Sequence, residues 1–248
     1  MPTNRRIGLV VPSSNTTMET EIPELLRRQQ ENGQQSFTFH SSRMRMREVS
    51  REELARMDAD SDRCALELSD ARCDVLAYAC LVAIMSMGSG YHCVSEARLS
   101  KVTAGNDGAV PVVSSAGALI DALTALGARR TAIITPYMKP LTALVADYIE
   151  DAGVEVADRI SLEVSDNLAV GRLDPAQLPA HARELDLAGV DAVVLSACVQ
   201  MPSLPAIQAV EDELGLPVVT AASATARSIL LAIGITPRIH GAGQLLAG

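Results

Sequence analysis

Two cysteines, Cys80 and Cys198, end apolar segments that match each other within the chain. Val75-Leu-Ala-Tyr-Ala-Cys80 aligns with Val193-Val-Leu-Ser-Ala-Cys198 at an offset of 118 residues. A lone cysteine in an aliphatic strand is more often a small hydrophobic side chain. Because both halves keep a thiol at the same strand end, we interpret the pair as chemical. Two opposed thiols would flank one ligand, and a thiol that acts as a nucleophile needs an electropositive setting.

Two further matched segments show that the elements around these cysteines are duplicated. Arg6-Ile-Gly-Leu-Val-Val-Pro12 aligns with Arg130-Thr-Ala-Ile-Ile-Thr-Pro136, and Val110-Pro-Val-Val-Ser-Ser-Ala116 aligns with Leu216-Pro-Val-Val-Thr-Ala-Ala222. Each apolar run is typical of a buried strand. Three matches in the same order indicate a repeated unit.

Helical patterns separate these strands and set the expected fold. A capping box at Ser50 and Glu53 starts a helix with one apolar face, and a second helix ends near Gly153. Two more helices are expected at 119–126 and 224–233. The alternation predicts an α/β protein of two similar lobes, 1–118 and 119–248, each a mostly parallel sheet flanked by helices and related by a pseudo-two-fold repeat. A C-terminal helix could cross to the first lobe, and the tail from Pro237 is expected to be partly disordered.

Ligands of open parallel sheets bind beyond the carboxyl ends of the strands. The repeat places Asn15, Cys80, Tyr137 and Cys198 at such ends, so the active site is expected between the lobes. Helix starts there supply backbone N–H groups that suit a carboxylate ligand. Asn15 is equally compatible with binding a ligand and with a turn or helix cap. Tyr137 favours a functional role, because aromatic residues are few in this chain. Asn167 read alone favours an Asx turn.

The other potential ligands give no metal site. Five cysteines form an odd set, and none of the intervals between them fits a zinc knuckle. Cys73 and Cys93 have no counterpart in the repeat and are interpreted as structural, and Cys64 as a core residue. None of the four histidines falls at a matched strand end, which disfavours a Cys–His hydrolase. We therefore expect no metal and no cofactor.

Composition excludes several classes of protein. The chain has 248 residues, 48% of them hydrophobic, and a formal charge of −9. No broad basic surface is available for nucleic acid. No apolar run reaches the roughly 20 residues that span a bilayer, and the start lacks a secretory signal. We expect a cytoplasmic protein without nucleic-acid or membrane partners.

Five segments of the chain carry a family resemblance. They are VVPSSNTTMETEIP from Val10, YACLVAIMSMG from Tyr78, ITPYMKP from Ile134, SDNLAVGRLDP from Ser165 and LSACVQMPSLP from Leu195. Together they closely resemble the bacterial maleate cis-trans isomerases of the aspartate/glutamate racemase superfamily. The resemblance runs from about residue 5 to about residue 230. In combination the segments are far more specific than any one of them.

The resemblance implies cofactor-free conversion of maleate, a small dicarboxylate, to fumarate, as in nicotinate degradation, by a homodimer. By the resemblance, Cys80 matches the nucleophile and Cys198 the proton donor. The residues that match the carboxylate-binding groups are the side chains of Asn15, Tyr137 and Asn167 and the backbone groups of Leu81, Val82 and Val199.

The chain departs from the amino-acid racemases of the superfamily at both cysteines. Cys80-Leu-Val and Ala-Cys198-Val-Gln replace polar contexts that an α-amino acid would need. A cofactor-independent two-cysteine racemase or decarboxylase acting on another small carboxylic acid remains the alternative enzyme. A two-lobed sensor of dicarboxylates is the alternative from another class.

Overall fold

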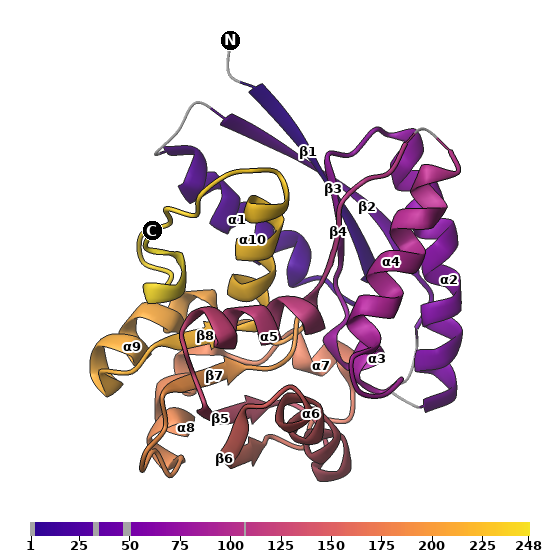
Figure 1. The fold of residues 1–248 in the computed structure, drawn as a ribbon. Coiled ribbons are helices and arrows are strands. Elements are labelled where there is room, and N and C mark those ends of the chain that lie inside the picture. The colour runs from indigo at the N-terminus through magenta and orange to yellow at the C-terminus, as the bar shows by residue number, and fades with distance from the viewer. Residues whose placement is uncertain (1–2, 32–34, 47–50, 107) are drawn as a thin grey trace.

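The computed structural model describes residues 3–31, 35–46, 51–106 and 108–248. They form two four-stranded sheets whose strands all pair in parallel, in the orders β2-β1-β3-β4 and β6-β5-β7-β8. The identical orders confirm the α/β fold of two similar units that the repeat predicted (Figure 1).

Six of the strands fall where the matched segments lie, and two more are added. Their bounds are β1 (Thr3–Pro12), β2 (Gln35–Met44), β3 (Val75–Tyr78), β4 (Val112–Ser114), β5 (Arg130–Thr135), β6 (Glu155–Ser161), β7 (Ala192–Ser196) and β8 (Val218–Thr220). The edge strands β2 and β6 were not predicted, because most of each is only half buried and neither sequence has a continuous apolar run.

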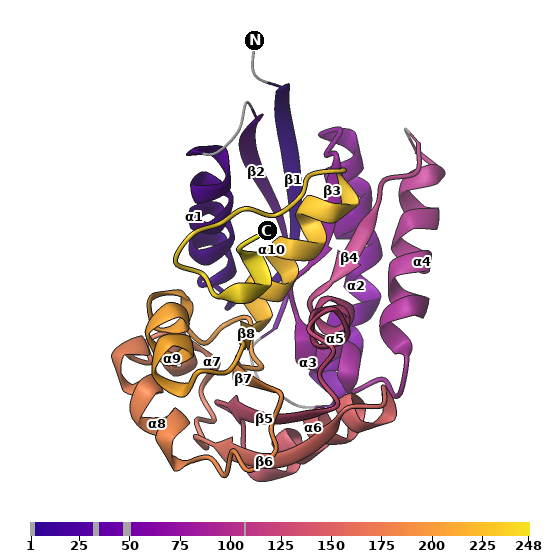
Figure 2. The same cartoon turned by 60° about the vertical axis from the view of Figure 1, so that its left-hand side comes forward.

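Helices cover the sheets and supply the connections between parallel strands (Figure 2). The α-helices are α1 (Met18–Glu31), α2 (Arg51–Asp70), α3 (Leu81–Met85), α4 (Tyr91–Ala104), α5 (Ser115–Ala125), α6 (Lys139–Asp151), α7 (Asn167–Val170), α8 (Leu178–Glu184), α9 (Ile207–Leu214) and α10 (Ala221–Ala232). Short 3₁₀ turns are η1 (Pro175–Gln177), η2 (Leu204–Ala206) and η3 (Gln244–Leu246).

The predicted helix starting at Ser50 corresponds to α2, although Ser50 itself lies outside the described residues. The predicted helix that stops near Gly153 is α6, and Gly153 has a φ of +90°, a conformation that glycine adopts at low cost.

Two helices join the units. The C-terminal α10 packs against α1, β3 and β4, and also against α5 (Figure 2). Helix α5 runs through residues 118 and 119, where the sequence divides the lobes, and also contacts β8. The division into lobes 1–118 and 119–248 stays a prediction.

The C-terminal tail differs from expectation. Ile239, Ala242, Leu245 and Leu246 are buried, and η3 forms within this segment. The expectation of partial disorder is wrong, because the tail carries enough apolar side chains to pack onto α10 and β8.

Within the described part of the chain, no helix is long and apolar enough to cross a membrane. The same residues contain no group of three or more His, Cys, Asp or Glu side chains placed to hold a metal ion.

Candidate active site

Cys80 and Cys198 lie at equivalent points of the two sheets. Cys80 is the second residue after β3, and Cys198 is the second residue after β7. Both are nearly closed off from solvent, with exposed fractions of 4% and 5%. The two sulfurs are close enough for charge on Cys198 to raise the pKa of Cys80, so the fold brings the thiols together.

Burial dominates the pKa of Cys80, which it raises to about 12. Cys80 is the N-cap of α3, and the backbone N–H of Ala83 opposes this rise by hydrogen-bonding to the thiolate. The charges of Cys198 and Asp58 raise the pKa further. In the ligand-free site Cys80 is therefore a protonated thiol at neutral pH.

Cys198 has more hydrogen-bond donors around its sulfur. Burial raises its pKa, while the Tyr137 hydroxyl and the backbone N–H groups of Gln200 and Met201 lower it. The Gln200 nitrogen lies 3.4 Å from the sulfur. These donors favour a thiolate at this position more than the single Ala83 N–H favours one at Cys80.

Tyr137 lies close enough to both thiols for their charges to affect its pKa. It follows β5, is 7% exposed, and its pKa is raised well above the ordinary value by burial and by the charges of Cys198 and Cys80. The hydroxyl consequently keeps its proton at neutral pH and acts as a hydrogen-bond donor.

Asn15 combines the two functions that its sequence context left open. Its Oδ1 accepts a hydrogen bond of 3.1 Å from the Met18 N–H, which caps α1. Its Nδ2 is buried and has no hydrogen-bond partner among the residues that the structure describes. A buried amide N–H₂ without a partner is costly, and a ligand oxygen would satisfy it.

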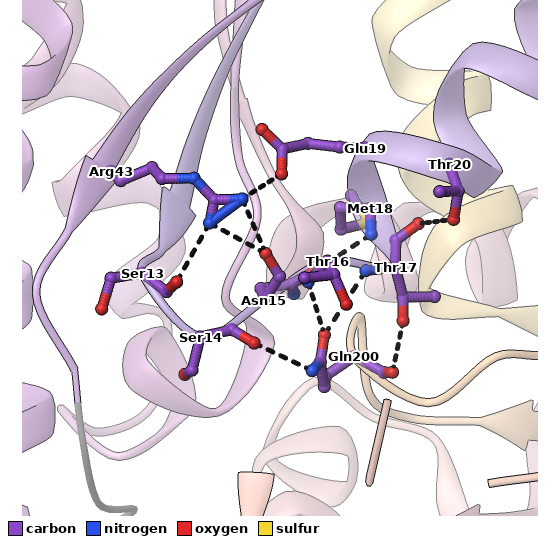
Figure 3. Close-up of polar contacts among 10 residues, drawn as sticks. All are labelled: Ser13, Ser14, Asn15, Thr16, Thr17, Met18, Glu19, Thr20, Arg43 and Gln200. Carbon is purple, nitrogen blue, oxygen red and sulfur yellow. Dashed lines mark hydrogen bonds and ion pairs between the residues drawn. The ribbon is translucent and has the colours of Figure 1, made fainter. Parts of the chain in front are cut away.

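The segment that carries Asn15 is held from two sides (Figure 3). Arg43 on β2 donates hydrogen bonds to the carbonyl oxygens of Ser13 and Asn15 and pairs with Glu19. Gln200, from the loop after Cys198, contacts Ser14, Thr16 and Thr17 from the other side. The Asn15 side chain is thus fixed before any ligand arrives.

Asn167 lies beside this segment rather than in an isolated turn. Its Nδ2 donates a 2.7 Å hydrogen bond to Ser14 Oγ. The preceding residue, Asp166, makes the Asx-type contact, because its side chain accepts from the Leu168 N–H and caps α7. The expectation of an Asx turn at Asn167 is therefore wrong by one position.

The predicted backbone contributors are also buried beside the thiols. Leu81 and Val82 form the first turn of α3, where N–H groups have no acceptor within the helix. Val199 follows Cys198 and is 5% exposed. A neighbouring cavity of about 340 Å³ is bounded in part by Tyr137 and Asn167, with apolar walls from Leu54, Leu141 and Val164.

The remaining cysteines and Lys139 do not take part in this arrangement. Cys64 and Cys73 are buried in the core, and Cys93 is exposed. Lys139 is largely exposed and pairs with Glu163 at 3.6 Å, so it is a surface charge. Sequence reasoning missed Gln200 as a contact, although it stands two residues after a repeat-matched cysteine.

A family model described as arylmalonate decarboxylase matches residues 7–246. The maleate isomerase of Geobacillus stearothermophilus is 62% identical over 244 residues, which cover 98% of this chain and 97% of that protein.

Two solved structures of maleate isomerases superpose closely on this chain. A cysteine-to-alanine variant of the maleate isomerase from Pseudomonas putida S16 with maleate superposes with a TM-score of 0.98 at 59% identity, covering 99% of this chain and 98% of that chain. A cysteine-to-serine mutant of Nocardia farcinica maleate cis-trans isomerase, with a covalently bound succinylcysteine intermediate, gives a TM-score of 0.95 at 49% identity, with 98% of each chain covered. With this identity over nearly its whole length, the chain belongs to the maleate isomerase family, within the group that the arylmalonate decarboxylase model describes.

Proposed function

We propose that this protein isomerises maleate to fumarate without a cofactor, by covalent addition of Cys80. The observation that carries the proposal is that two repeat-related thiols lie together, while Gln200 ties the second thiol to the segment of Asn15, whose buried amide Nδ2 has no partner among the described residues. This combination offers a nucleophile, a proton source and an anion-binding group to one small ligand.

The chemical problem is rotation about a carbon–carbon double bond. The Cys80 thiol first loses its proton to solvent and regains it when the cycle ends. The Cys80 thiolate adds to one alkene carbon of maleate, so that a C–S bond forms and the π electrons move toward the adjacent carboxylate as an enediolate. The former double bond is then a single bond that rotates between staggered wells. Collapse of the enediolate expels the Cys80 thiolate and leaves fumarate.

Neutral donors stabilise the charge that develops on the carboxylate. We assign this role to the side chains of Asn15, Tyr137 and Asn167 and the backbone groups of Leu81, Val82 and Val199. Donors that are fixed in place before the reaction cost no reorganisation when charge develops. The fixed Asn15 segment and the protonated Tyr137 support the assignment.

Cys198 is assigned as the proton donor. Its thiol protonates the neighbouring carbon to give succinyl-Cys80, and the resulting Cys198 thiolate takes the same proton back before the C–S bond breaks. Protons and electrons then balance over a cycle. The donors around the Cys198 sulfur support this role, because they stabilise the thiolate that exists only while the proton is on carbon.

The Nocardia farcinica relative supports a single nucleophile. That protein has lost one cysteine to serine and still carries a succinyl group on a cysteine. If the pair in this chain behaves alike, only one of its two thiols forms the bond to carbon.

Proton NMR of maleate mixed with the purified protein, without added cofactor, tests the reaction. The fumarate signal is expected to grow at the expense of the maleate signal. Parallel samples with a phenyl-substituted malonate and with aspartate cover the alternatives. Carbon dioxide from the malonate, or solvent deuterium in aspartate, without conversion of maleate would overturn the proposal.

A further inference from the structure

Gln200 occupies a junction of three segments that carry the candidate site. It follows Cys198 by two residues and is 3% exposed. Its side chain contacts the Asn15 segment (Figure 3) and also the backbone at the start of α7. Its partners Thr16 and Asn167 are 184 and 33 residues away in the sequence. One side chain therefore ties together loops from both sheets.

The side-chain amide of Gln200 uses its full hydrogen-bonding capacity. Its Oε1 accepts from the N–H groups of Thr16 at 3.0 Å and Thr17 at 3.5 Å. Its Nε2 donates to the carbonyl oxygens of Ser14 at 3.0 Å and Asn167 at 3.1 Å. An amide offers two acceptor sites and two donors, and all four are matched here.

The main chain of Gln200 connects this junction to the thiol. Thr17 Oγ1 donates a 2.7 Å hydrogen bond to the Gln200 carbonyl, and the Gln200 N–H donates to Cys198 Sγ at 3.4 Å. A shift of Gln200 would therefore move a donor at the sulfur and, through Ser14 and Thr16, the backbone on both sides of Asn15.

We propose that Gln200 is a positioning residue that sets the Asn15 amide, the Asn167 side chain and the Cys198 thiol at fixed mutual distances across the two lobes. The inference rests on the proposed function and deepens it, because the binding groups and the acid then act on one ligand only while Gln200 holds them in place. A misplacement of about 1 Å at such a site can cost about 10²-fold in rate.

A second buried contact between the units provides a matched control. Glu21 on α1 accepts from the N–H groups of Ser203 at 2.6 Å and Leu204 at 2.7 Å, and from Ser203 Oγ at 3.2 Å. It is 6% exposed and bonds to none of the candidate site residues named above. If Gln200 merely joins the units, then loss of either contact should have the same consequence.

A substitution at Gly171 can displace the Gln200 side chain while residue 200 itself stays a glutamine. A Cβ at Gly171 would lie 2.6 Å from Gln200 Nε2. The φ of Gly171 is −68°, so alanine fits the backbone there, and the three atoms nearest to the added methyl all belong to the Gln200 amide group. In a Gln200→Ala background these three atoms are removed.

The test measures kcat and KM for maleate, together with thermal unfolding, for Gln200→Ala, Gln200→Glu, Gly171→Ala, Gly171→Ala/Gln200→Ala and Glu21→Gln. Gln200→Ala and Gly171→Ala should each lower kcat/KM, about 10²-fold for Gln200→Ala, and the double variant should be no worse than Gln200→Ala. Glu21→Gln should lower the unfolding temperature with kcat/KM nearly unchanged. Multiplying effects of the two substitutions, or equal kinetic losses in Gln200→Ala and Glu21→Gln, would overturn the inference.

Gln200→Glu adds a readout that a purely structural contact would not move. A carboxylate would face the carbonyl oxygens of Ser14 and Asn167 with acceptors only, whereas a protonated carboxyl restores one donor. Activity of Gln200→Glu relative to the unchanged protein should therefore rise as pH falls. A ratio independent of pH would contradict the positioning role.

Alkylation of Cys198 separates failure of this inference from failure of the proposed function. If the unchanged protein does not convert maleate, the proposed function has failed, and the rate of Cys198 modification by iodoacetamide, followed by peptide mass spectrometry, decides the inference. An altered rate in Gln200→Ala and Gly171→Ala but not in Glu21→Gln supports it. The same rate in all four proteins overturns it.

Discussion

The thiols of Cys80 and Cys198 occupy equivalent points of the two sheets, yet their surroundings differ. After Cys80 the chain enters α3 at once, whereas after Cys198 it forms a loop before η2. That loop wraps the N–H groups of Gln200 and Met201 around the second sulfur. The repeat supplies two facing thiols, and the divergent connections make them chemically unequal.

The inequality fits the proposed roles. A thiolate with few donors has a high pKa and is a strong nucleophile, although it is rarely populated. A thiol with several donors loses its proton more readily and holds the resulting charge. Cys80 has the first environment and Cys198 the second.

Removal of the nucleophile should have the largest effect. Cys80→Ala is expected to lower kcat/KM for maleate by at least about 10⁴-fold, because the proposed nucleophile is gone and Cys198 is assigned to proton transfer. NMR of fumarate formation measures the loss. Cys64→Ala, which alters a buried thiol outside the site, serves as the control and should keep its rate; comparable losses in both variants would indicate damage to the fold instead.

Removal of the acid should cost less. Cys198→Ser is expected to lower kcat about 10²- to 10⁴-fold, the range typical of a positioned proton donor. Maleate binding, followed by a thermal shift, should persist because the carboxylate donors remain. Turnover at the unchanged rate would remove Cys198 from the mechanism.

The hydroxyl of Tyr137 should contribute next. Tyr137→Phe removes a donor to the Cys198 thiolate, and a hydrogen bond to a charged group contributes about 1.5–3 kcal/mol. We expect kcat/KM to fall about 10- to 100-fold. Tyr148→Phe, which removes a hydroxyl bonded to His92, is the matched control. An equal loss of kcat/KM in Tyr137→Phe and Tyr148→Phe would contradict a specific role of the Tyr137 hydroxyl.

The pH dependence of Cys80 alkylation should show the smallest of these effects. Because its pKa is raised to about 12, the thiolate fraction grows about tenfold per pH unit below that value. Alkylation of Cys80 in the ligand-free protein should therefore rise without a plateau from pH 7 to about pH 10. A small free thiol in the same buffers should level off above about 8.5. A plateau for Cys80 near neutrality would show a stabilised thiolate instead.

The fold was largely predictable from sequence, because parallel strands that are buried on both faces leave continuous apolar runs. These runs occur twice in the same order, which indicates two similar units. The edge strands β2 and β6 were not predictable, since their more polar, half-buried sequences give no such run. Cys80, Cys198 and Tyr137 could be placed at strand ends. The contacts of Gln200 could not, because they join segments up to 186 residues apart and depend on how the units pack.

Asn15 shows where local reasoning stops. A helix cap and a ligand donor were equally compatible with its sequence, and the structure assigns the cap to Oδ1 while leaving Nδ2 unpartnered. Which atom of a side chain is satisfied depends on packing that sequence patterns do not encode.

The inequality of the two thiols is tested most directly by locating the covalent adduct. Cys80→Ser and Cys198→Ser are each incubated with maleate, quenched in acid and mapped by peptide mass spectrometry. A succinyl group on Cys80 in the Cys198→Ser protein, with none on Cys198 in the Cys80→Ser protein, is the predicted result. A succinyl group on Cys198, or equal modification of both, would contradict the assignment of distinct roles.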